Sequence, residues 1–223
     1  NTVLVQLERQ SSRDQIGEVL VVGKASMGQK LNRGKVRYVD TNIPVSTSRA
    51  RNIGIRQARC EILYFLDGDC LPQVDCLEQH LRAHSAGHVL VGGGVLMPID
   101  ENYWNLTYNL AIFHEFLSDQ GTGARNYLPG LNLTVARSVV TEVGDFDENL
   151  LRGQDIDWTA RARVAGFQPW FCAGAVVEHR HTRKSLDALW QDCANSGYYM
   201  RQVRLNNAST LQAPWWLKKR WLV

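Results

Sequence analysis

Short apolar runs place the strongest constraint on how this chain can fold. They cover residues 18–22, 61–66 and 88–91, and a fourth follows at 170–177. Each run has the length of a buried strand rather than of a helix. The stretches between them carry helical spacing, and strands that alternate with helices indicate βα units. We therefore expect an α/β fold with a mainly parallel sheet flanked by helices, in which ligands bind beyond the carboxyl ends of the strands.

Three of the intervening stretches predict particular helices. Residues 2–10 have a helical pattern and lead directly into the first apolar run. Pro72 is a favourable first-turn residue for a helix that carries Leu77 on its apolar face. A valine stripe from Val135 to Val143 predicts a further helix, closed by Gly144.

Composition excludes several classes of protein. The 223 residues suffice for one well-buried α/β domain, and 44% hydrophobic with 21% charged residues excludes a disordered chain. A net charge of +3, without an arginine-rich stripe, argues against a nucleic acid partner. The five cysteines are odd in number and lack C-x-x-C spacing, which favours free thiols in a cytoplasmic protein.

The end of the chain differs from the rest. We expect one domain over residues 1–205 and a C-terminal tail over 206–223, where 213–223 mix three tryptophans with three cations. Indoles and cations suit a membrane interface, so this tail predicts peripheral contact with the inner face of the membrane. The alternative is an aromatic tail docked on the domain. No apolar run approaches the roughly 20 residues that span a bilayer.

Two aspartates follow the second apolar run. Asp67 and Asp69 flank Gly68, and Pro72 comes shortly after. Two carboxylates at the carboxyl end of a strand offer hard oxygen ligands to Mg²⁺ or Mn²⁺, which could hold a substrate diphosphate. The alternative is a turn that caps the next helix, and a lone D-G-D often has only that role.

A second acidic cluster lies near residue 155. Asp155 and Asp157 fall in the first turn of a helix that begins near Gln154, where the helix dipole favours carboxylates. Being two residues apart, they point to different faces, so one can face a site while the other pairs with a nearby arginine. His179 and His181 follow the last strand and are either metal or diphosphate contacts or surface histidines.

Taken together, these segments resemble glycosyltransferase family 2. The resemblance rests on six short segments in order: A-R-N-I-G at 50–54, L-D-G-D at 66–69, L-P-G-L-N at 128–132, G-D-F-D-E at 144–148, G-Q-D-I-D-W at 153–158, and His179. It covers roughly residues 1 to 200 and implies a GT-A fold.

The resemblance also implies an activity and a set of site residues. The implied activity is an inverting transfer of a sugar from a nucleoside-diphosphate sugar to a hydroxyl of a glycan or lipid-linked acceptor, with Mn²⁺ or Mg²⁺ holding the diphosphate. Asp155 matches the catalytic base. The other implied positions are metal ligands Asp69 and His179, donor contacts Arg51, Asn52, Asp67 and Asp69, and acceptor-side residues Trp104, Asn132, Asp157 and Trp158.

Three departures from the family pattern keep alternatives open. The opening strand of the family is not found, Val22 is not followed by the usual aspartate, and Gln154 replaces a glutamate beside Asp155. A GT-A-like scaffold that no longer binds a donor is one alternative. A nucleotidyltransferase is another, although no Gly-rich basic loop lies near residue 1. The aromatic residues of 103–126 either stack on an acceptor sugar or fill the core.

Overall fold

The structure is a computed structural model of the whole chain, and it describes residues 2–24, 34–96, 103–180 and 185–211. The predicted tail at 213–223 and His181 lie outside these residues. The helices are α1 (Thr2–Glu8), α2 (Thr47–Gln57), α3 (Cys76–Ser85), α4 (Tyr103–Phe113), α5 (Arg137–Val143), α6 (Gln154–Val164), α7 (Leu186–Asn206) and α8 (Ala208–Leu211), with 3-10 turns η1 (Arg13–Gln15) and η2 (His114–Phe116). The strands are β1 (Val19–Gly23), β2 (Val36–Asp40), β3 (Ile62–Leu66), β4 (Cys70–Pro72), β5 (Leu90–Leu96), β6 (Gly123–Ala124), β7 (Asn132–Ala136) and β8 (Trp170–His179).

The main sheet has six strands. Its order is β3-β7-β5-β8-β4, and β6 also pairs with β8. Among the described strands of this sheet, only β5 and β8 pair in parallel, because β7 inserts antiparallel between β3 and β5, and β4 runs antiparallel along β8. The predicted α/β fold is confirmed, but the sheet is mixed rather than mainly parallel. The reason is that β7 and β4 were not recognised as strands in the sequence.

A second, two-stranded sheet is formed by β1 and β2, which pair in parallel with each other. Helix α2 packs on β1. Helix α1 precedes β1 as predicted, and no strand precedes β1 among the described residues.

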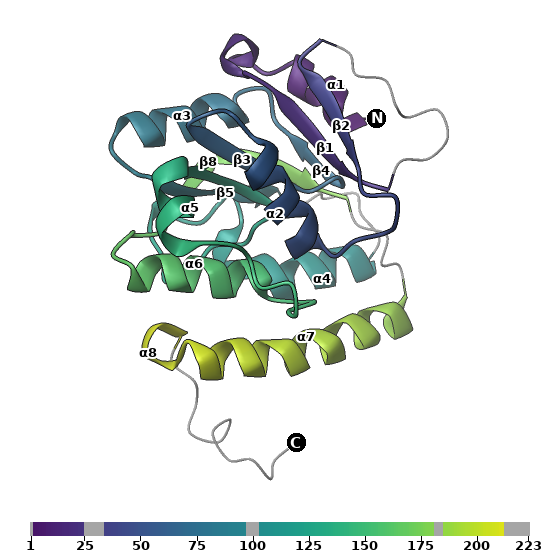
Figure 1. Cartoon of the computed structure of the whole chain (residues 1–223). Helices are drawn as coiled ribbons and strands as arrows, with labels where there is room; N and C mark the ends of the chain where they lie inside the picture. The colour runs from purple at the N-terminus through teal and green to yellow at the C-terminus, as the bar shows by residue number, and fades with distance from the viewer. Residues whose placement is uncertain (1, 25–33, 97–102, 181–184, 212–223) are drawn as a thin grey trace.

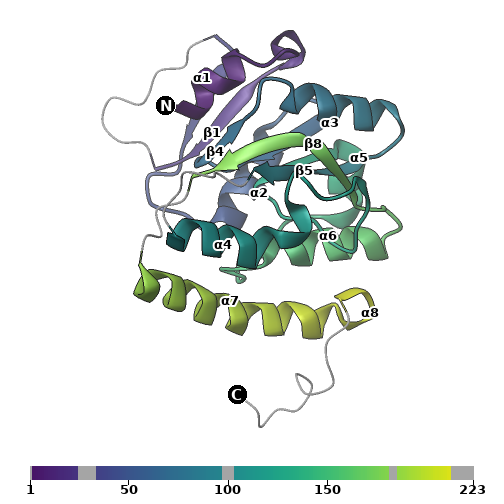
Figure 2. The same cartoon turned by 180° about the vertical axis from the view of Figure 1, so that it is seen from behind.

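Helices cover the main sheet on both faces, and α7 runs along the outside of α4 and α6 (Figures 1 and 2). Helix α3 packs on β5 and β8. On the face of α2, α5 and α6, a buried cluster includes Trp158, which stacks on Phe146 with ring centroids 5.0 Å apart. A smaller cluster lies near α4 and includes Tyr108 and Phe113. None of the described helices combines the length and the apolar character needed to cross a bilayer.

Two local predictions were wrong. Pro72 ends β4 instead of opening α3, which begins only at Cys76. Val135 belongs to β7, and the helix of the valine stripe starts two residues later, at Arg137. Both errors arise because a strand lies just before each helix, β7 directly before α5 and β4 a short turn before α3, so its residues were included in the helical pattern.

Close backbone approach explains the glycine run in β5. A Cβ on Gly93 would lie 2.1 Å from Nδ2 of Asn132 and 2.2 Å from the carbonyl oxygen of Ala175. A side chain at this position would therefore push β5 away from β7 and β8.

Candidate active site

The D-G-D segment forms the turn between β3 and β4. The amide of Asp67 donates to the carbonyl of Leu131 at 3.1 Å, and the amide of Cys70 donates to the carbonyl of Asp67 at 3.0 Å. The side chains of Asp67 and Asp69 are 38% and 45% exposed. The turn interpretation is thus correct, whereas the next helix, α3, begins with Asp75 at its N-cap position. Both carboxylates are thus partly exposed to solvent.

His179 ends β8 and faces the second of these aspartates. Its Nε2 lies 3.6 Å from Oδ2 of Asp69, and its side chain is only 8% exposed. Its Nδ1 lies 2.9 Å from Oδ1 of Asn109 in α4. Because that amide oxygen only accepts, Nδ1 donates this hydrogen bond, and Nε2 is the ring nitrogen that faces Asp69.

Helix α4 builds the wall behind this histidine. Asn109 is fully buried, and the ring of Phe113 stands edge-on to the imidazole with centroids 5.3 Å apart. Sequence reasoning did not identify Asn109. In the sequence, Asn109 is marked only as a carboxamide among the apolar residues near the centre of a hydrophobic helix.

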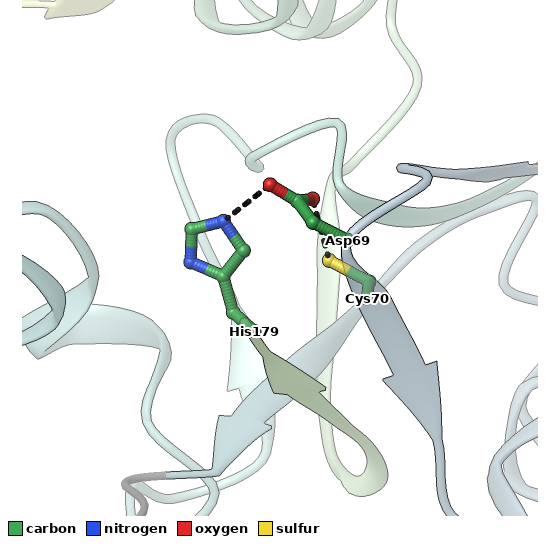
Figure 3. A group of neighbouring side chains, drawn as sticks. All are labelled: Asp69, Cys70 and His179. Atoms are coloured by element: carbon green, nitrogen blue, oxygen red, sulfur yellow. Dashed lines mark hydrogen bonds and ion pairs between the residues drawn. The ribbon is translucent and has the colours of Figure 1, made fainter. Parts of the chain in front are cut away.

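The side chains at this point fit a divalent cation. Figure 3 shows Asp69, Cys70 and His179 facing one another, and one ligand atom from each lies within 4.8 Å of the other two. A carboxylate oxygen and an imidazole nitrogen, with the other ring nitrogen held by a hydrogen bond, form a usual metal-binding pair.

Arg51 lies on the other side of the D-G-D turn. It is 8% exposed, and its Nη2 donates to Oδ1 of Asp67 and to the carbonyl of Gly130, at 3.0 Å each. Burial raises the pKa of Asp67, Arg51 acts to lower it, and the carboxylates of Asp155 and Asp69 raise it further. The acidic groups of the two sequence clusters are therefore close enough to influence one another.

Asp155 reaches the same place from the first turn of α6. Its Oδ2 accepts from the amide of Gly130 at 2.7 Å, and its Oδ1 accepts from the amide of Ile156 at 2.9 Å. The backbone of Gly130 thus contacts Asp155 through its N–H and Arg51 through its carbonyl. A Cβ on Gly130 would lie 2.6 Å from Nη1 of Arg51, so this position requires glycine. No feature of the sequence indicated that Gly130 joins the two clusters.

Asn52 has a different position from the one its motif implied. It is 1% exposed, exchanges hydrogen bonds of 2.9 Å with the backbone of Phe146, and donates to the carboxylate of Glu148 at 3.0 Å. Its side chain therefore holds the loop that precedes α6.

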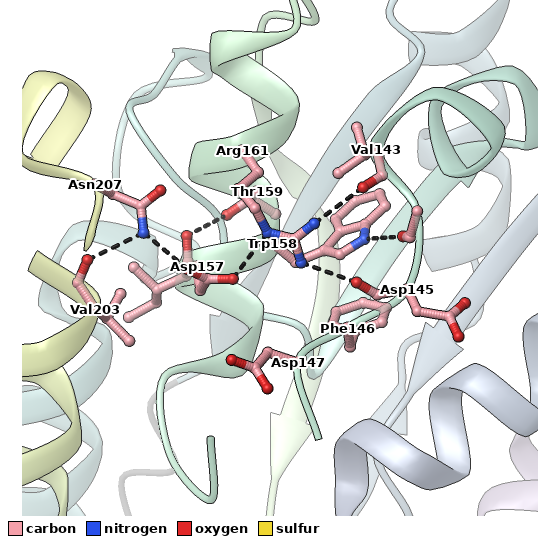
Figure 4. A network of polar contacts seen from close by, with 12 residues as sticks. Val143, Asp145, Phe146, Asp147, Asp157, Trp158, Thr159, Arg161, Val203 and Asn207 are labelled. Atoms are coloured by element: carbon pink, nitrogen blue, oxygen red, sulfur yellow. Dashed lines mark hydrogen bonds and ion pairs between the residues drawn. The ribbon is translucent and has the colours of Figure 1, made fainter. Parts of the chain in front are cut away.

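Two of the acceptor-side candidates, Asp157 and Trp158, belong to the interior of α6 (Figure 4). Asp157 pairs with Nε of Arg161 at 2.9 Å and accepts from Asn207 at 2.8 Å. Trp158 is fully buried and donates to the carbonyl of Gly144 at 2.7 Å. The predicted divergence of Asp155 and Asp157 is confirmed, and the side chains of Asp157 and Trp158 both point into the packed core.

Asn132 and Trp104 complete the predicted set. Asn132 is 1% exposed and accepts from Tyr64 at 2.8 Å and from His80 at 2.9 Å, on the side of the sheet that α3 covers. The sheet therefore lies between this side chain and Asp155. Trp104 lies at the start of α4 and is partly exposed. Among the other aromatics, Tyr108 and Phe113 are buried, as the core interpretation required.

A cavity of about 270 Å³ lies beside the first turn of α6. Arg204 on α7 lines it and makes no hydrogen bond or ion pair with any residue that the structure describes. The remaining lining residues are Asn126, Tyr127, Ile156, Met200 and Leu211.

Asp67, Asp69 and His179 lie at strand ends of the main sheet, and Asp155 lies opposite them. This fold and site define the class of GT-A proteins. Solved structures of similar fold support this assignment. The mannosyltransferase PcManGT of Pyrobaculum calidifontis, in complex with GDP-Man and Mn²⁺, superposes with a TM-score of 0.67 at 17% identity, over 95% of this chain and 61% of that one. GalNAc-T7 with UDP, GalNAc and Mn²⁺ superposes with a TM-score of 0.63 at 12% identity, over 92% of this chain and 47% of that one. The 1–349 fragment of TarS from S. aureus superposes with a TM-score of 0.63 at 12% identity, over 94% of this chain and 61% of that one.

Sequence comparison gives the family. The model described as "Glycosyltransferase like family 2" matches residues 22–198, so the chain belongs to glycosyltransferase family 2. Glycosyltransferase AglE of Haloferax volcanii is 36% identical over 131 residues, which are 58% of this chain and 43% of that protein. The chain therefore spans less than half the length of this relative.

Proposed function

We propose that this chain transfers a sugar from a nucleoside-diphosphate sugar to an acceptor hydroxyl with inversion at the anomeric carbon. The observation that carries the proposal is the backbone of Gly130, whose N–H and carbonyl link Asp155 to the Arg51–Asp67 pair. It supports an arrangement in which the donor-binding residues and the candidate base are held at fixed positions relative to one another.

In this proposal Asp155 is the general base. It accepts the proton of the acceptor hydroxyl as that oxygen attacks the anomeric carbon, while the bond from that carbon to the diphosphate oxygen breaks. Such a base typically contributes about 10²–10⁴-fold to the rate. Hydrogen bonds from two backbone amides fix the carboxylate, and each oxygen keeps a further lone pair for the proton.

The donor lies, in this proposal, against Asp67, Asp69 and His179. A divalent cation, Mn²⁺ or Mg²⁺, held by Asp69 and His179 would supply charge neutralisation for the departing nucleoside diphosphate. Two of the similar solved structures contain Mn²⁺ together with a nucleotide or nucleotide sugar. Arg51 positions Asp67, and Asn52 positions the loop before α6.

For the acceptor we propose the cavity between α6, α7 and Tyr127. Ile156, which follows Asp155, lines it, and so does Arg204. An acceptor glycan or lipid-linked sugar in this cavity would approach the base from the side opposite the D-G-D turn, with Trp104 on α4 as a further candidate contact.

Titration of UDP, GDP and dTDP into the 223-residue chain, first with Mn²⁺ and then with EDTA, tests the donor site. We expect one nucleotide to bind in the presence of metal only, and Asp69→Ala to weaken that binding. A donor-deficient scaffold would bind none of the three. A nucleotidyltransferase would instead bind nucleoside triphosphates and release pyrophosphate.

The base is tested separately, with the sugar nucleotide that the titration identifies. Asp155→Asn should retain nucleotide affinity and lose release of the nucleoside diphosphate, both with glycan acceptors and in slow hydrolysis by water. Glu142→Gln, an exposed carboxylate at the end of α5, is the matched control. Full turnover by Asp155→Asn would exclude it as the base.

We also propose that the tail at 213–223 contacts a membrane from the cytoplasmic side. Flotation with anionic liposomes should separate the full chain from a chain ending at residue 212. Equal flotation of the two would remove the basis for this contact.

A further inference from the structure

Cys70 lies beside the proposed metal ligands and has no role in the proposed transfer. In the antiparallel pairing of β4 with β8 it stands directly opposite His179, so the two side chains share one face of the sheet. It also follows Asp69 in the chain, and its Sγ is 3.8 Å from Oδ1 of that carboxylate. The thiol, the carboxylate and the imidazole therefore converge from two strands (Figure 3).

A hard cation makes no use of this thiol. Mg²⁺ and Mn²⁺ prefer oxygen ligands, whereas Zn²⁺ and Co²⁺ bind thiolate and imidazole well. We propose that Cys70 Sγ is a third protein ligand for such softer divalent ions, so that this site binds Zn²⁺ more tightly than Mn²⁺. The proposal rests on the metal site of the proposed function and adds the selectivity of that site.

The geometry needs only a small adjustment. Bonds of about 2.0–2.3 Å to a tetrahedral ion place ligand atoms roughly 3.3–3.7 Å apart. In this structure the three ligand atoms lie within 4.8 Å of one another, and His179 Nε2 is already 3.6 Å from Asp69 Oδ2. Asp69 is 45% exposed, while Cys70 and His179 are buried and fixed by the β4–β8 pairing. The fourth position stays open to a diphosphate oxygen or water.

Binding of the metal ion would exchange the proton of the thiol for the ion. The thiol releases its proton to solvent and the sulfur donates a lone pair to the ion, with no change of oxidation state. Since the thiolate also neutralises part of the ion's charge, Zn²⁺ held in this way would be a weaker partner for the diphosphate than Mn²⁺ and would inhibit transfer.

The competing interpretation is that Cys70 only fills the core. It belongs to the same buried cluster as Cys76, which is also fully buried. Cys76 differs in its partners, because its Sγ contacts Tyr64 at 3.5 Å and Asn132 at 3.8 Å and not Asp69. Cys76→Ser is therefore a matched control for Cys70→Ser.

Cobalt absorption on the full chain tests the proposal without any measurement of activity. Co²⁺ added to the wild-type protein should produce a thiolate-to-metal charge-transfer band in the near ultraviolet, and Cys70→Ser, Asp69→Ala and His179→Ala should each lose it. Cys70→Ser should weaken Zn²⁺ binding by roughly 100-fold, since loss of even an outer-shell partner costs 10–100-fold. It should change Mn²⁺ affinity by less than about threefold, because a hard ion does not use the thiol. Cys76→Ser should keep the band and both affinities.

Two results would overturn the inference. One is a wild-type cobalt spectrum without a thiolate band, which requires no variant and is independent of how Cys70→Ser folds. The other is a band that survives in Cys70→Ser. In either case, loss of Mn²⁺ binding in Asp69→Ala would leave the proposed function intact, whereas unchanged Mn²⁺ binding in that variant would contradict the proposed metal site itself.

Discussion

Oδ1 of Asn109 lies 2.9 Å from Nδ1 of His179, and this contact directs the other ring nitrogen toward Asp69. A helix far from the D-G-D turn in sequence thereby sets the orientation of a proposed metal ligand. The relationship makes α4 part of the site, although none of its residues carries a charge.

Asn109→Ala should weaken Mn²⁺ binding by about 10–100-fold, because the imidazole loses the acceptor that fixes its tautomer. Calorimetric titration of Mn²⁺ measures the change. Asn109→Asp keeps an acceptor at the same place and should restore most of the affinity, which a purely structural role would not predict. Thr107→Ala on the same helix should have no effect. Unaltered Mn²⁺ affinity in Asn109→Ala would contradict the assignment.

Gly130→Ala should lower nucleotide affinity and destabilise the fold by about 1–3 kcal/mol, the usual cost of overpacking. The added Cβ would lie 2.6–2.8 Å from three atoms of the Arg51 guanidinium, so Arg51 must leave Asp67 or the loop must move. Nucleotide titration and chemical unfolding measure the two effects. At Gly121 a Cβ would meet no heavy atom within 4 Å, so Gly121→Ala should match the wild type.

Arg204→Gln should raise the KM for the acceptor about tenfold or more while nucleotide affinity stays unchanged. The reason is that a lost hydrogen bond to a charged group costs about 1.5–3 kcal/mol, and Arg204 lines the cavity beside Asp155 without a hydrogen-bonding partner in the described structure. Steady-state kinetics with donor and acceptor varied in turn checks this. Its neighbour Gln202 is exposed on α7, and Gln202→Ala should leave both constants as they are. An equal loss of donor affinity would contradict the assignment of Arg204 to the acceptor.

Stability should fall as the pH drops from about 6.5 to 4 because of His80. Burial lowers the pKa of His80 to about 4, so the unfolded chain takes up a proton in this range while the folded protein does not. The full contribution is present above the unfolded pKa of about 6.5, and the loss on acidification amounts to about 3 kcal/mol.

Urea unfolding at several pH values measures this slope. His80→Gln should flatten it relative to the wild type, whereas His114→Gln, which replaces an exposed histidine, should leave it unchanged. The interpretation would be wrong if both variants kept the wild-type slope.

Features of this fold that depend on neighbouring residues were predicted from the sequence, whereas features that depend on residues far apart in the chain were not. Strands β1, β3, β5 and β8 were predicted because each is an apolar run whose burial is a property of its own residues. Strand β7 was missed because it alternates polar with apolar residues. Its Asn132 and Thr134 are buried only because His80, 52 and 54 positions away, supplies hydrogen bonds to both.

The candidate site follows the same division. Helical geometry alone predicts that Asp155 and Asp157 diverge, but it does not say which of the two faces the D-G-D turn. That choice depends on Gly130, which binds Asp155, and on Asn207, which binds Asp157. Both partners come from other elements of the fold.

The sequence by itself determined the α/β class, the acidic segments and their order along the chain, because these depend on residue type and local periodicity. The tertiary structure alone decided that the sheet is mixed, that Asn109 orients His179, that Gly130 joins Arg51 to Asp155, and that Cys70 faces the proposed metal ligands. The physical reason is that hydrogen bonds and ligand sites need atoms within a few ångströms of one another. Only the packing of distant segments brings such atoms together.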